Sequence, residues 1–531
     1  HTLILWNGIP LNSLATGLSD LYSINTHNFT NVILVNGGNS SIFGSGALGG
    51  SIHLNSNLES INKNEISFSK TIGSYGLNSE SVTLFLTDKK LSAKVSLQSL
   101  IHANNFDYIN TTQIGSPEVS NEYGKIKSTN NQIDVHYKLN SNTNYTFNYW
   151  DNQYEREVPQ NMTTPFSDAK QYDKYKRVLF TLKHKINYLS IRIKQAYLQE
   201  DFRYTEVSKN INSYFLAESY ISDADIKFIT GNYLLNIGGM FINNNVNNKN
   251  YISNYKKERS LAVFSSFQYK SKLLSLNSIL RKEWQTTFEV PTIPTIAMVA
   301  NLNSNLKIRT KFNRNFRSPT FNDRFWIGAS SYGNPKLKAE DAWNKEFGFD
   351  FTKKNIKFSA TAYTLNISDM ILWQQNESGS WTPINLQKVC SRGIEIKSKI
   401  KINYLSIESS FAYTKSTNES KTNNLDNTIG EQLRYVPIHK GNINFLYSMD
   451  NLQFSLNTTY TGEVITSHSI DKNKTLDSFT LSNFAIQYNF EKIPIIITGK
   501  INNLLNKTYI TYENYPNARR EILLTLNYTI N

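Results

Sequence analysis

Apolar and polar residues alternate with a period of two along most of this chain, and this alternation limits the folds that it can adopt. The pattern is clearest in LSAKVSLQ (91–98), LKIRTKFNR (306–314), GIEIKSKI (393–400) and ILLTLNYTI (522–530). A period of two is the repeat of a β-strand with one apolar and one polar face. Helical spacing is almost absent after residue 60. The alternation therefore predicts an all-β chain.

The connections between the alternating segments fall into two classes. Very short polar turns, including two copies of KINYLSI, alternate with longer connections rich in Asn, Ser, Tyr and Trp. The short turns lie near residues 87, 139, 185, 230, 302, 352, 401 and 448, and the long connections span 104–127, 151–172, 316–342 and 366–388. Counting segments between these connections gives roughly 22 strands, which is an even number.

Alternating strands, an even strand number and turns that are short at one end only are typical of a transmembrane antiparallel β-barrel. Within hydrocarbon every backbone N–H and C=O must be paired, and only a closed sheet achieves this without helices. A wet lumen agrees with the mean hydropathy of −0.44, and the 31 Tyr and 29 Phe can supply aromatic rows at the interfaces. A large soluble all-β protein is the alternative, but it does not predict alternating loop lengths. We expect a barrel in a Gram-negative outer membrane, in contact with its lipid.

The composition excludes several other classes of protein. The formal charge is +14, but Lys and Arg are spread along the chain without an arginine-rich arm, so nucleic acid is not an expected partner. With Cys390 as the single cysteine, neither an intrachain disulfide nor a thiolate metal cluster can form. No hydrolase or zinc-protease motif occurs, so we expect no enzyme, no cofactor and no metal centre. Calcium would need more loop carboxylates than Asp168 and Asp173 provide.

A glycine cluster lies in VILVNGGNSSIFGSGALGGSIHL (32–54), which contains a literal G-x-G-x-x-G at 44–49. A dinucleotide-binding fingerprint must open a helix within a βαβ unit. Here the following SIHLNSN (51–57) has the pattern of a strand and a turn. The glycines therefore favour tight turns and close backbone contacts in a compact piece outside the barrel wall.

Several segments together resemble the TonB-dependent outer-membrane receptors. HTLILWNGIPLN (1–12) and the glycine segment are similar to the C-terminal half of that family's plug domain. In the barrel, NFRSPTFNDRFW with GNPKLKAED, NLQKVCSRGIEIKSK, and the closing segment from INNLLNKTY onward resemble family landmarks in the same order. The chain departs from the family at Asn7, where aspartate is usual, and at Asn36–Asn39, where an arginine-glycine-proline turn is usual.

The resemblance implies a partial plug over residues 1–60 inside a barrel over residues 61–531. The first half of the plug and the segment that contacts the TonB-type energy-coupling complex are expected before His1. The implied function is active uptake of a scarce, bulky solute, with a surface lipoprotein as a further partner. Lys307, Arg309, Lys311, Glu395 and Lys397 are expected to face the lumen as solvated wall or plug contacts. A passive porin, the alternative from another class, predicts an open lumen without a plug.

Residues in the loops narrow the choice among candidate solutes. No histidine lies within 316–337, a region where haem receptors of this family tend to carry one, so haem is disfavoured. The turn LWNG (5–8) and the end of the glycine segment most resemble cobalamin-receptor-like members, with a ferric siderophore as the alternative. Amides and rings such as Trp326, Trp373 and Trp381 suit a corrinoid. By resemblance, the expected solute contacts, for which ordinary loop packing is the alternative, are Leu14, Ala15, Thr16, Gly17, Arg434, Tyr435, Ser467 and His468.

Overall fold

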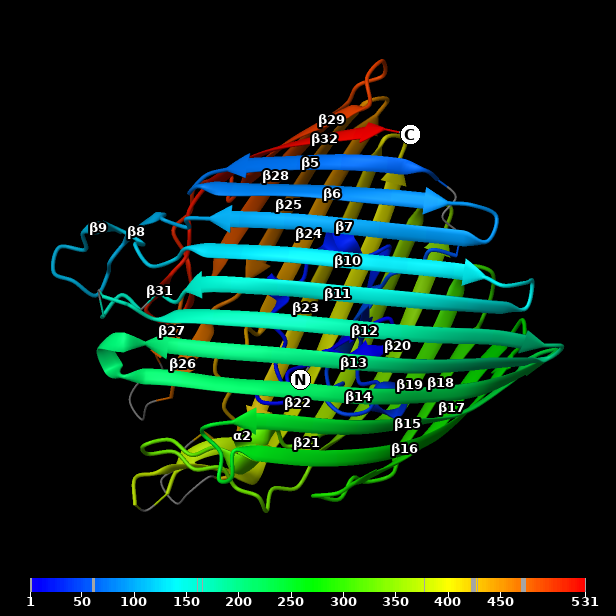
Figure 1. Ribbon diagram of the computed structural model, residues 1–531, viewed down its shortest axis with the longest axis horizontal. Helices are drawn as coiled ribbons and strands as arrows, with labels where there is room; N and C mark the ends of the chain where they lie inside the picture. The colour runs from blue at the N-terminus through cyan, green and yellow to red at the C-terminus, as the bar shows by residue number, and fades with distance from the viewer. Residues whose placement is uncertain are drawn as a thin grey trace.

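A closed antiparallel barrel of 22 strands makes up most of the molecule (Figure 1). The computed structural model describes residues 2–59, 63–159, 161–164, 166–376, 378–421, 426, 428–468 and 474–530. The expected fold class and strand number are confirmed. The wall strands are β5 (Glu65–Gly73), β6 (Leu77–Thr87), β7 (Leu91–His102), β10 (Ile126–Lys138), β11 (Thr143–Glu157), β12 (Lys170–Ile186), β13 (Leu189–Glu206), β14 (Ile211–Thr230), β15 (Tyr233–Asn248), β16 (Tyr255–Lys270), β17 (Leu274–Gln285), β18 (Ile293–Asn301), β19 (Leu306–Arg317), β20 (Glu340–Lys353), β21 (Ile356–Gln375), β22 (Trp381–Ile402), β23 (Leu405–Asn418), β24 (His439–Met449), β25 (Leu452–Thr461), β28 (Phe479–Asn489), β29 (Ile495–Asn502) and β32 (Glu521–Ile530).

The barrel closes where its last strand meets its first. β32 pairs antiparallel with β5, from Leu523 opposite Gly73 to Ile530 opposite Ile66. At this seam the hydroxyls of Thr71 and Thr525 are 2.9 Å apart. Closure pairs the backbone groups that an open sheet would leave unpaired at its edges, which is the condition for a sheet in hydrocarbon.

The two ends of the barrel differ as the loop pattern predicted. At one end, on the right of Figure 1, strands are joined by tight turns. Both copies of KINYLSI place an asparagine, Asn187 or Asn403, in the left-handed conformation (φ 49° and 47°) at a two-residue turn, as hairpins with such turns require. The other end carries the helix α2 (Phe321–Phe325) and the hairpins β8 (Asp107–Ile109) with β9 (Glu118–Ser120), β26 (Val464–Ser467) with β27 (Lys474–Leu476), and β30 (Ile510–Tyr512) with β31 (Tyr515–Pro516).

One expected long connection is wrong. Residues 366–388 lie largely within β21 and β22, which continue as a paired hairpin as far as Gln375 opposite Trp381. The register shifts between Ile367 and Met370, so the period of two is interrupted there. Within the described residues, no helix is long and apolar enough to cross a bilayer.

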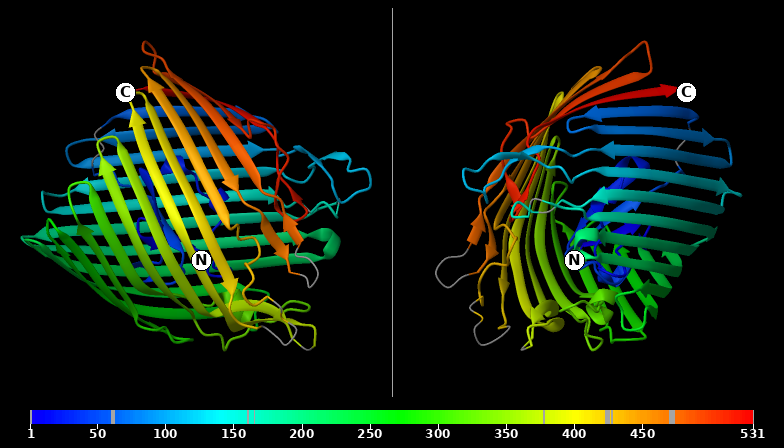
Figure 2. Two further views of the ribbon diagram at one scale, coloured as in Figure 1. Left: turned by 180° about the vertical axis from the view of Figure 1, so that it is seen from behind. Right: turned by 60° about the vertical axis from the view of Figure 1, so that its left-hand side comes forward.

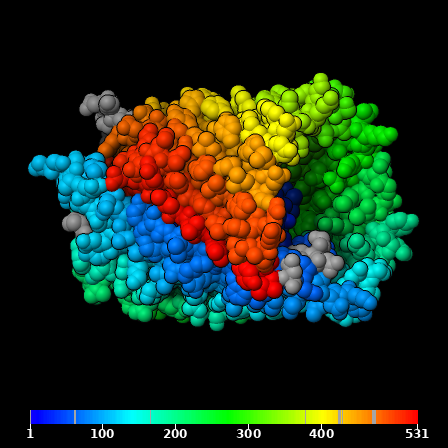
Figure 3. Space-filling view, turned by 90° about the horizontal axis from the view of Figure 1, so that it is seen from above, coloured from blue at the N-terminus to red at the C-terminus, as the bar shows by residue number. Residues whose placement is uncertain are grey.

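Residues 2–55 form a small mixed sheet inside the barrel, the dark blue element of Figure 2. Its strands are β1 (Thr2–Trp6), β2 (Ile9–Pro10), β3 (Asn31–Asn36) and β4 (Gly50–Asn55), in the order β2-β1-β4-β3, with η1 (Leu21–Ser23), η2 (Thr26–Asn28) and α1 (Ser40–Phe43) between them. β4 directly follows the glycines, so the expectation of a strand there is confirmed and a dinucleotide-type helix is not present at this place. Figure 3 shows a hollow in the barrel, with a small dark blue part of the N-terminal residues visible inside it.

Apolar packing fixes the small sheet against one side of the wall. Trp6 is fully buried and its ring lies 5.9 Å from that of Trp150 on β11. Phe29 packs edge-on against the same ring at 5.3 Å, and the Arg177 guanidinium lies 4.1 Å over it. Aromatic pairs of this kind add about 0.5–1.5 kcal/mol beyond the burial of their area.

Lysines from three wall strands hold turns of the small sheet through main-chain oxygens. Each ammonium donates a hydrogen bond to a backbone carbonyl of a turn or 3₁₀ segment. The pairs are Lys94 with Asn28 at 2.7 Å, Lys194 with Asn7 at 2.8 Å and Lys311 with Gly38 at 2.7 Å. The expected lumenal position of Lys311 is therefore confirmed.

The unusual Asn36 also contacts the wall. Its side-chain amide donates to the carboxylate of Glu395 on β22 at 2.9 Å, which confirms that Glu395 faces the lumen. The expected boundary between residues 60 and 61 falls outside the described residues and stays a prediction.

Candidate functional site

The segment Leu14–Gly17 is pinned to the helix α2 at the long-loop end. The carbonyls of Leu14 and Ala15 accept hydrogen bonds from the backbone N–H groups of Phe321 and Asn322, both at 3.1 Å. Ala15 is fully buried. The helix itself begins with a capping box, in which Thr320 and Asp323 each bond the other's backbone N–H. These contacts give the segment a fixed position at the inner side of the loops.

A cavity of about 550 Å³ lies beside this segment. Its inner side is formed by the stretch from Ser13 to Asp20, and its outer side by β11–β15 and α2. Phe202 and Phe215 stack in its wall with ring centroids 4.9 Å apart and an interplanar angle of 15°. The remaining rings that line it are Tyr175, Tyr204 and Trp326, and its amides are Gln171, Asn248 and Asn322. Concave sites of this kind suit a ligand with both an apolar face and polar substituents.

Acidic groups outnumber basic ones in this cavity. Arg156 donates to Asp20 at 2.6 Å and to Asp173 at 3.1 Å, so it links the small sheet to the barrel. Glu200 also lines the cavity, which gives three carboxylates against one guanidinium. The cavity therefore disfavours an anionic ligand.

A smaller cavity of about 220 Å³ separates the glycine loop from the wall. Three ion pairs border it: Arg281 with Glu283 at 2.8 Å, Arg317 with Glu340 at 2.6 Å, and Arg324 with Glu258 at 2.6 Å. Both members of each pair belong to the barrel. The small sheet thus presents an uncharged loop to a charged wall, which it approaches closely at Gly44.

Arg434, Tyr435 and the segment around Ser467 form a second group, in the outer loops. The backbone N–H of Tyr435 donates to Ile465 at 2.8 Å. The ring of Tyr435 stacks on Tyr512 at 4.6 Å with an interplanar angle of 9°. Ser467 is exposed and His468 is half-buried.

An ion pair lies within this second group. Lys474 bonds Glu513, and this contact holds the pKa of the Glu513 carboxyl below its ordinary value. No hydrogen bond or ion pair between described residues joins this group to Leu14–Gly17. The predicted contacts therefore divide into two places, and their role in solute binding stays a prediction.

Apart from Trp326, the barrel residues that form the cavity wall were missed by sequence reasoning. Tyr175, Phe202 and Tyr204 lie on the inward face of strands that are longer than a membrane requires. The signal that would have found them is an aromatic residue on the otherwise polar face, more than about ten residues from the tight-turn end of its strand.

The two acidic residues considered for calcium have different partners. Asp168 accepts from the backbone and the hydroxyl of Ser208, at 2.7 and 2.8 Å, whereas Asp173 pairs with Arg156. Among the described residues, no group of three or more His, Cys, Asp and Glu side chains could hold a metal ion.

Comparison with family models agrees with this architecture. Residues 55–504 match the model described as TonB dependent receptor-like, beta-barrel, and residues 1–51 match the TonB-dependent receptor plug domain. The chain belongs to the TonB-dependent receptor family. Members of this family are receptors and transporters rather than enzymes. The small sheet is accordingly a plug, which argues against the porin alternative.

Several relatives carry the name vitamin B12 transporter BtuB. The one from Photobacterium profundum is 30% identical over 238 residues, which cover 44% of this chain and 37% of that protein. The one from Vibrio vulnificus is 22% identical over 553 residues, which cover 99% of this chain and 84% of that protein. The first match thus spans little more than a third of the relative's length.

Solved structures share the fold at lower identity. The siderophore receptor PirA from Acinetobacter baumannii matches with a TM-score of 0.82 at 15% identity, over 100% of this chain and 90% of that one. The FrpB iron transporter from Neisseria meningitidis matches with a TM-score of 0.81 at 12% identity, over 100% and 91%. At these identities the likeness shows the fold alone.

Proposed function

We propose that this protein is a cobalamin receptor of a Gram-negative outer membrane, which takes up the corrinoid with energy from a TonB-type complex. The observation that carries the proposal is the cavity above the plug segment Ser13–Asp20, with rings and amides on its walls and an excess of carboxylates. A corrinoid is larger than this cavity and would seat one face in it. Both named relatives, as vitamin B12 transporters, support this solute.

The charge of the cavity favours a corrinoid over a ferric siderophore, which is the main alternative solute. A ferric catecholate siderophore is a multiply charged anion, and three carboxylates face it here against one guanidinium. Cyanocobalamin carries no net charge and presents many side-chain amides. Amide partners such as Gln171, Asn248 and Asn322 can donate and accept hydrogen bonds with them.

Binding of radiolabelled cyanocobalamin to cells displaying the protein tests the proposal. Saturable binding that excess ferric catecholate or haem does not displace is the expected result. Replacing Phe202 by Ala removes one ring of the stacked pair and should weaken binding about tenfold, because a lost aromatic contact costs about 1–2 kcal/mol.

The matched control is Phe180→Ala on the neighbouring strand, where the ring points away from the lumen and is 41% exposed. This variant should bind as the parent does. Displacement by haem or by the ferric siderophore, but not by unlabelled cobalamin, would refute the assignment.

A further inference from the structure

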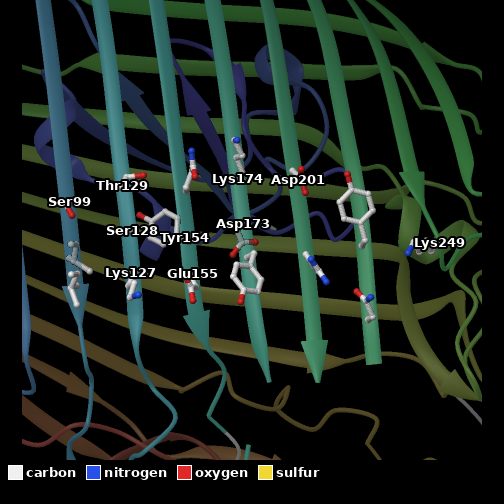
Figure 4. A pocket seen from close by; sticks show the side chains of 17 residues that line it. Ser99, Lys127, Ser128, Thr129, Tyr154, Glu155, Asp173, Lys174, Asp201 and Lys249 are labelled. Atoms are coloured by element: carbon white, nitrogen blue, oxygen red, sulfur yellow. The ribbon is translucent and has the colours of Figure 1, made fainter. Parts of the chain in front are cut away.

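A second hollow, of about 1000 Å³, lies on the outside of the barrel near the long-loop end. It follows β7 and β10–β14, and Figure 4 shows its side chains on these neighbouring strands, with the plug beyond them. The strand register places its outer row side by side, with Lys127 paired to Glu155, then Tyr172, Arg203 and Tyr214. Their sequence neighbours, such as Tyr154 and Asp173, face inward and are buried.

The hollow begins where the apolar outer surface ends. On β12 the outward residues Val178, Phe180 and Leu182 are apolar, whereas Lys176, Lys174 and Tyr172 follow toward the long-loop end. Since a strand rises about 3.3 Å per residue, the lining residues Lys174 and Tyr172 lie roughly 13–20 Å along the strand from Val178, the last apolar position. Because barrel strands tilt by about 35–45°, the hollow lies roughly 10–15 Å beyond the hydrocarbon, on the side of the polar headgroups.

Among the described residues the cations in the hollow form no close ion pair, although Lys127 lies opposite Glu155 and Lys174 opposite Asp201 on neighbouring strands. Lys127, Lys174, Arg203 and Lys249 line it, against the outward carboxylates Glu155 and Asp201. Among the described residues, none of these four cations lies within 4.0 Å of a carboxylate. In the lumen, by contrast, Arg156, Arg281 and Arg324 are all paired.

We propose that this hollow binds the phosphorylated saccharide headgroup of an outer-leaflet glycolipid. Lys174 and Arg203 would bind phosphate through charge-assisted hydrogen bonds. The rings of Tyr172 and Tyr214, which border the same row, offer apolar faces for sugar rings. The acyl chains would lie along the apolar surface that includes Phe180.

The test uses the purified protein in detergent micelles, with bis-phosphorylated lipid A as the probe and native mass spectrometry as the readout. The double variant Lys174→Gln/Arg203→Gln should bind lipid A about tenfold to thirtyfold more weakly, because each basic group near a membrane surface contributes about 1 kcal/mol. Lipid A that lacks its phosphates should have the same affinity for the parent protein as for the double variant.

A matched control removes two outward cations from the opposite wall. Arg392 and Lys415 are cross-strand neighbours on β22 and β23 and do not line the hollow. Arg392→Gln/Lys415→Gln should change lipid A affinity less than about twofold. Equal losses in the two double variants, or equal binding of dephosphorylated lipid A, would overturn the proposal. Cyanocobalamin binding should be unchanged in both, so this result is independent of the proposed solute.

Discussion

Gly38 has almost no space for a side chain at the contact between plug and wall. A Cβ atom there would lie under 3.0 Å from the carboxamide atoms of Asn315 on β19. Asn315 cannot easily move, because its Oδ1 accepts from the Ser40 backbone at 3.1 Å and from the Asn313 amide at 2.9 Å. The carbonyl of Gly38 is also the acceptor for Lys311. Any side chain at this position must displace the turn from the wall.

Gly38→Ala should therefore loosen the plug. We expect amide hydrogen exchange in residues 31–50 to become about tenfold faster, since overpacking of a tight contact costs about 1–3 kcal/mol. Exchange measured by mass spectrometry checks this. Gly441→Ala is the control, because a Cβ there meets its nearest atom at 3.7 Å. Unchanged exchange in Gly38→Ala would show that the contact does not hold the plug.

At the level of elements, β4 carries a titratable group within the plug. His53 is half-buried, its Nε2 lies 2.9 Å from the Ser51 hydroxyl, and its ring packs edge-on to Phe43 at 4.8 Å. Burial lowers the pKa of His53 below its ordinary value of 6.5. The unfolded plug therefore binds this proton more readily than the folded plug does.

Acid should destabilise the plug through His53. As the pH falls below about 6.5, the unfolded state takes up the proton first, so the free energy of unfolding decreases. Exchange of β4 amides, corrected for the intrinsic rate, should be faster at pH of about 5.5 than at about 7.5. In His53→Gln this difference should shrink. A difference of the same size in both proteins would assign the pH dependence to another group.

The elements also show what sequence patterns can predict. Tight turns were predicted well because a two-residue hairpin needs a left-handed residue, and Asn187 and Asn403 mark such turns locally. The hairpin over 366–388 was missed because its register shift, next to Asp369 with φ of 55°, breaks the alternation. Contacts such as that of Lys194 with Asn7 join residues 187 positions apart. Periodicity shows which face of a strand is polar, but it does not show which distant residue that face contacts.

For the molecule as a whole, closure of the barrel joins the two ends of the wall. Thr71 and Thr525 are directly paired across the β5–β32 seam. Cysteines at both positions, in a Cys390→Ser background, should form one intramolecular disulfide, because directly paired strand residues have suitable Cα separations. The boiled, non-reduced protein should then migrate faster on a denaturing gel than the reduced protein.

Thr71→Cys with Thr361→Cys is the control, since Thr361 on β21 pairs with Gly348 and Glu395 instead. This pair should not cross-link. Failure of the seam pair to oxidise, in protein that still shows heat-dependent mobility, would contradict the closure described above.

The candidate site also belongs to the whole molecule. Its cavity is built by the plug segment Ser13–Asp20, by strands β11–β15 and by α2, which lie far apart in the chain. Sequence resemblance pointed to Leu14–Gly17, and these residues do lie at the inner side of the loops. The resemblance could not predict the barrel residues on the other side of the cavity. Their identity depends on the orientation of the plug within the barrel, which determines the strands that face Ser13–Asp20.

The lysine contacts have a consequence for how the plug and barrel can diverge. Lys94, Lys194 and Lys311 bind main-chain oxygens, and every amino acid possesses that atom. A substitution at Asn28 or Asn7 therefore leaves the carbonyl acceptor in place, provided that the backbone of the turn keeps its conformation. Chimeras that transplant the plug of one receptor into the barrel of another should succeed or fail on the geometry of those turns more than on the identity of their residues.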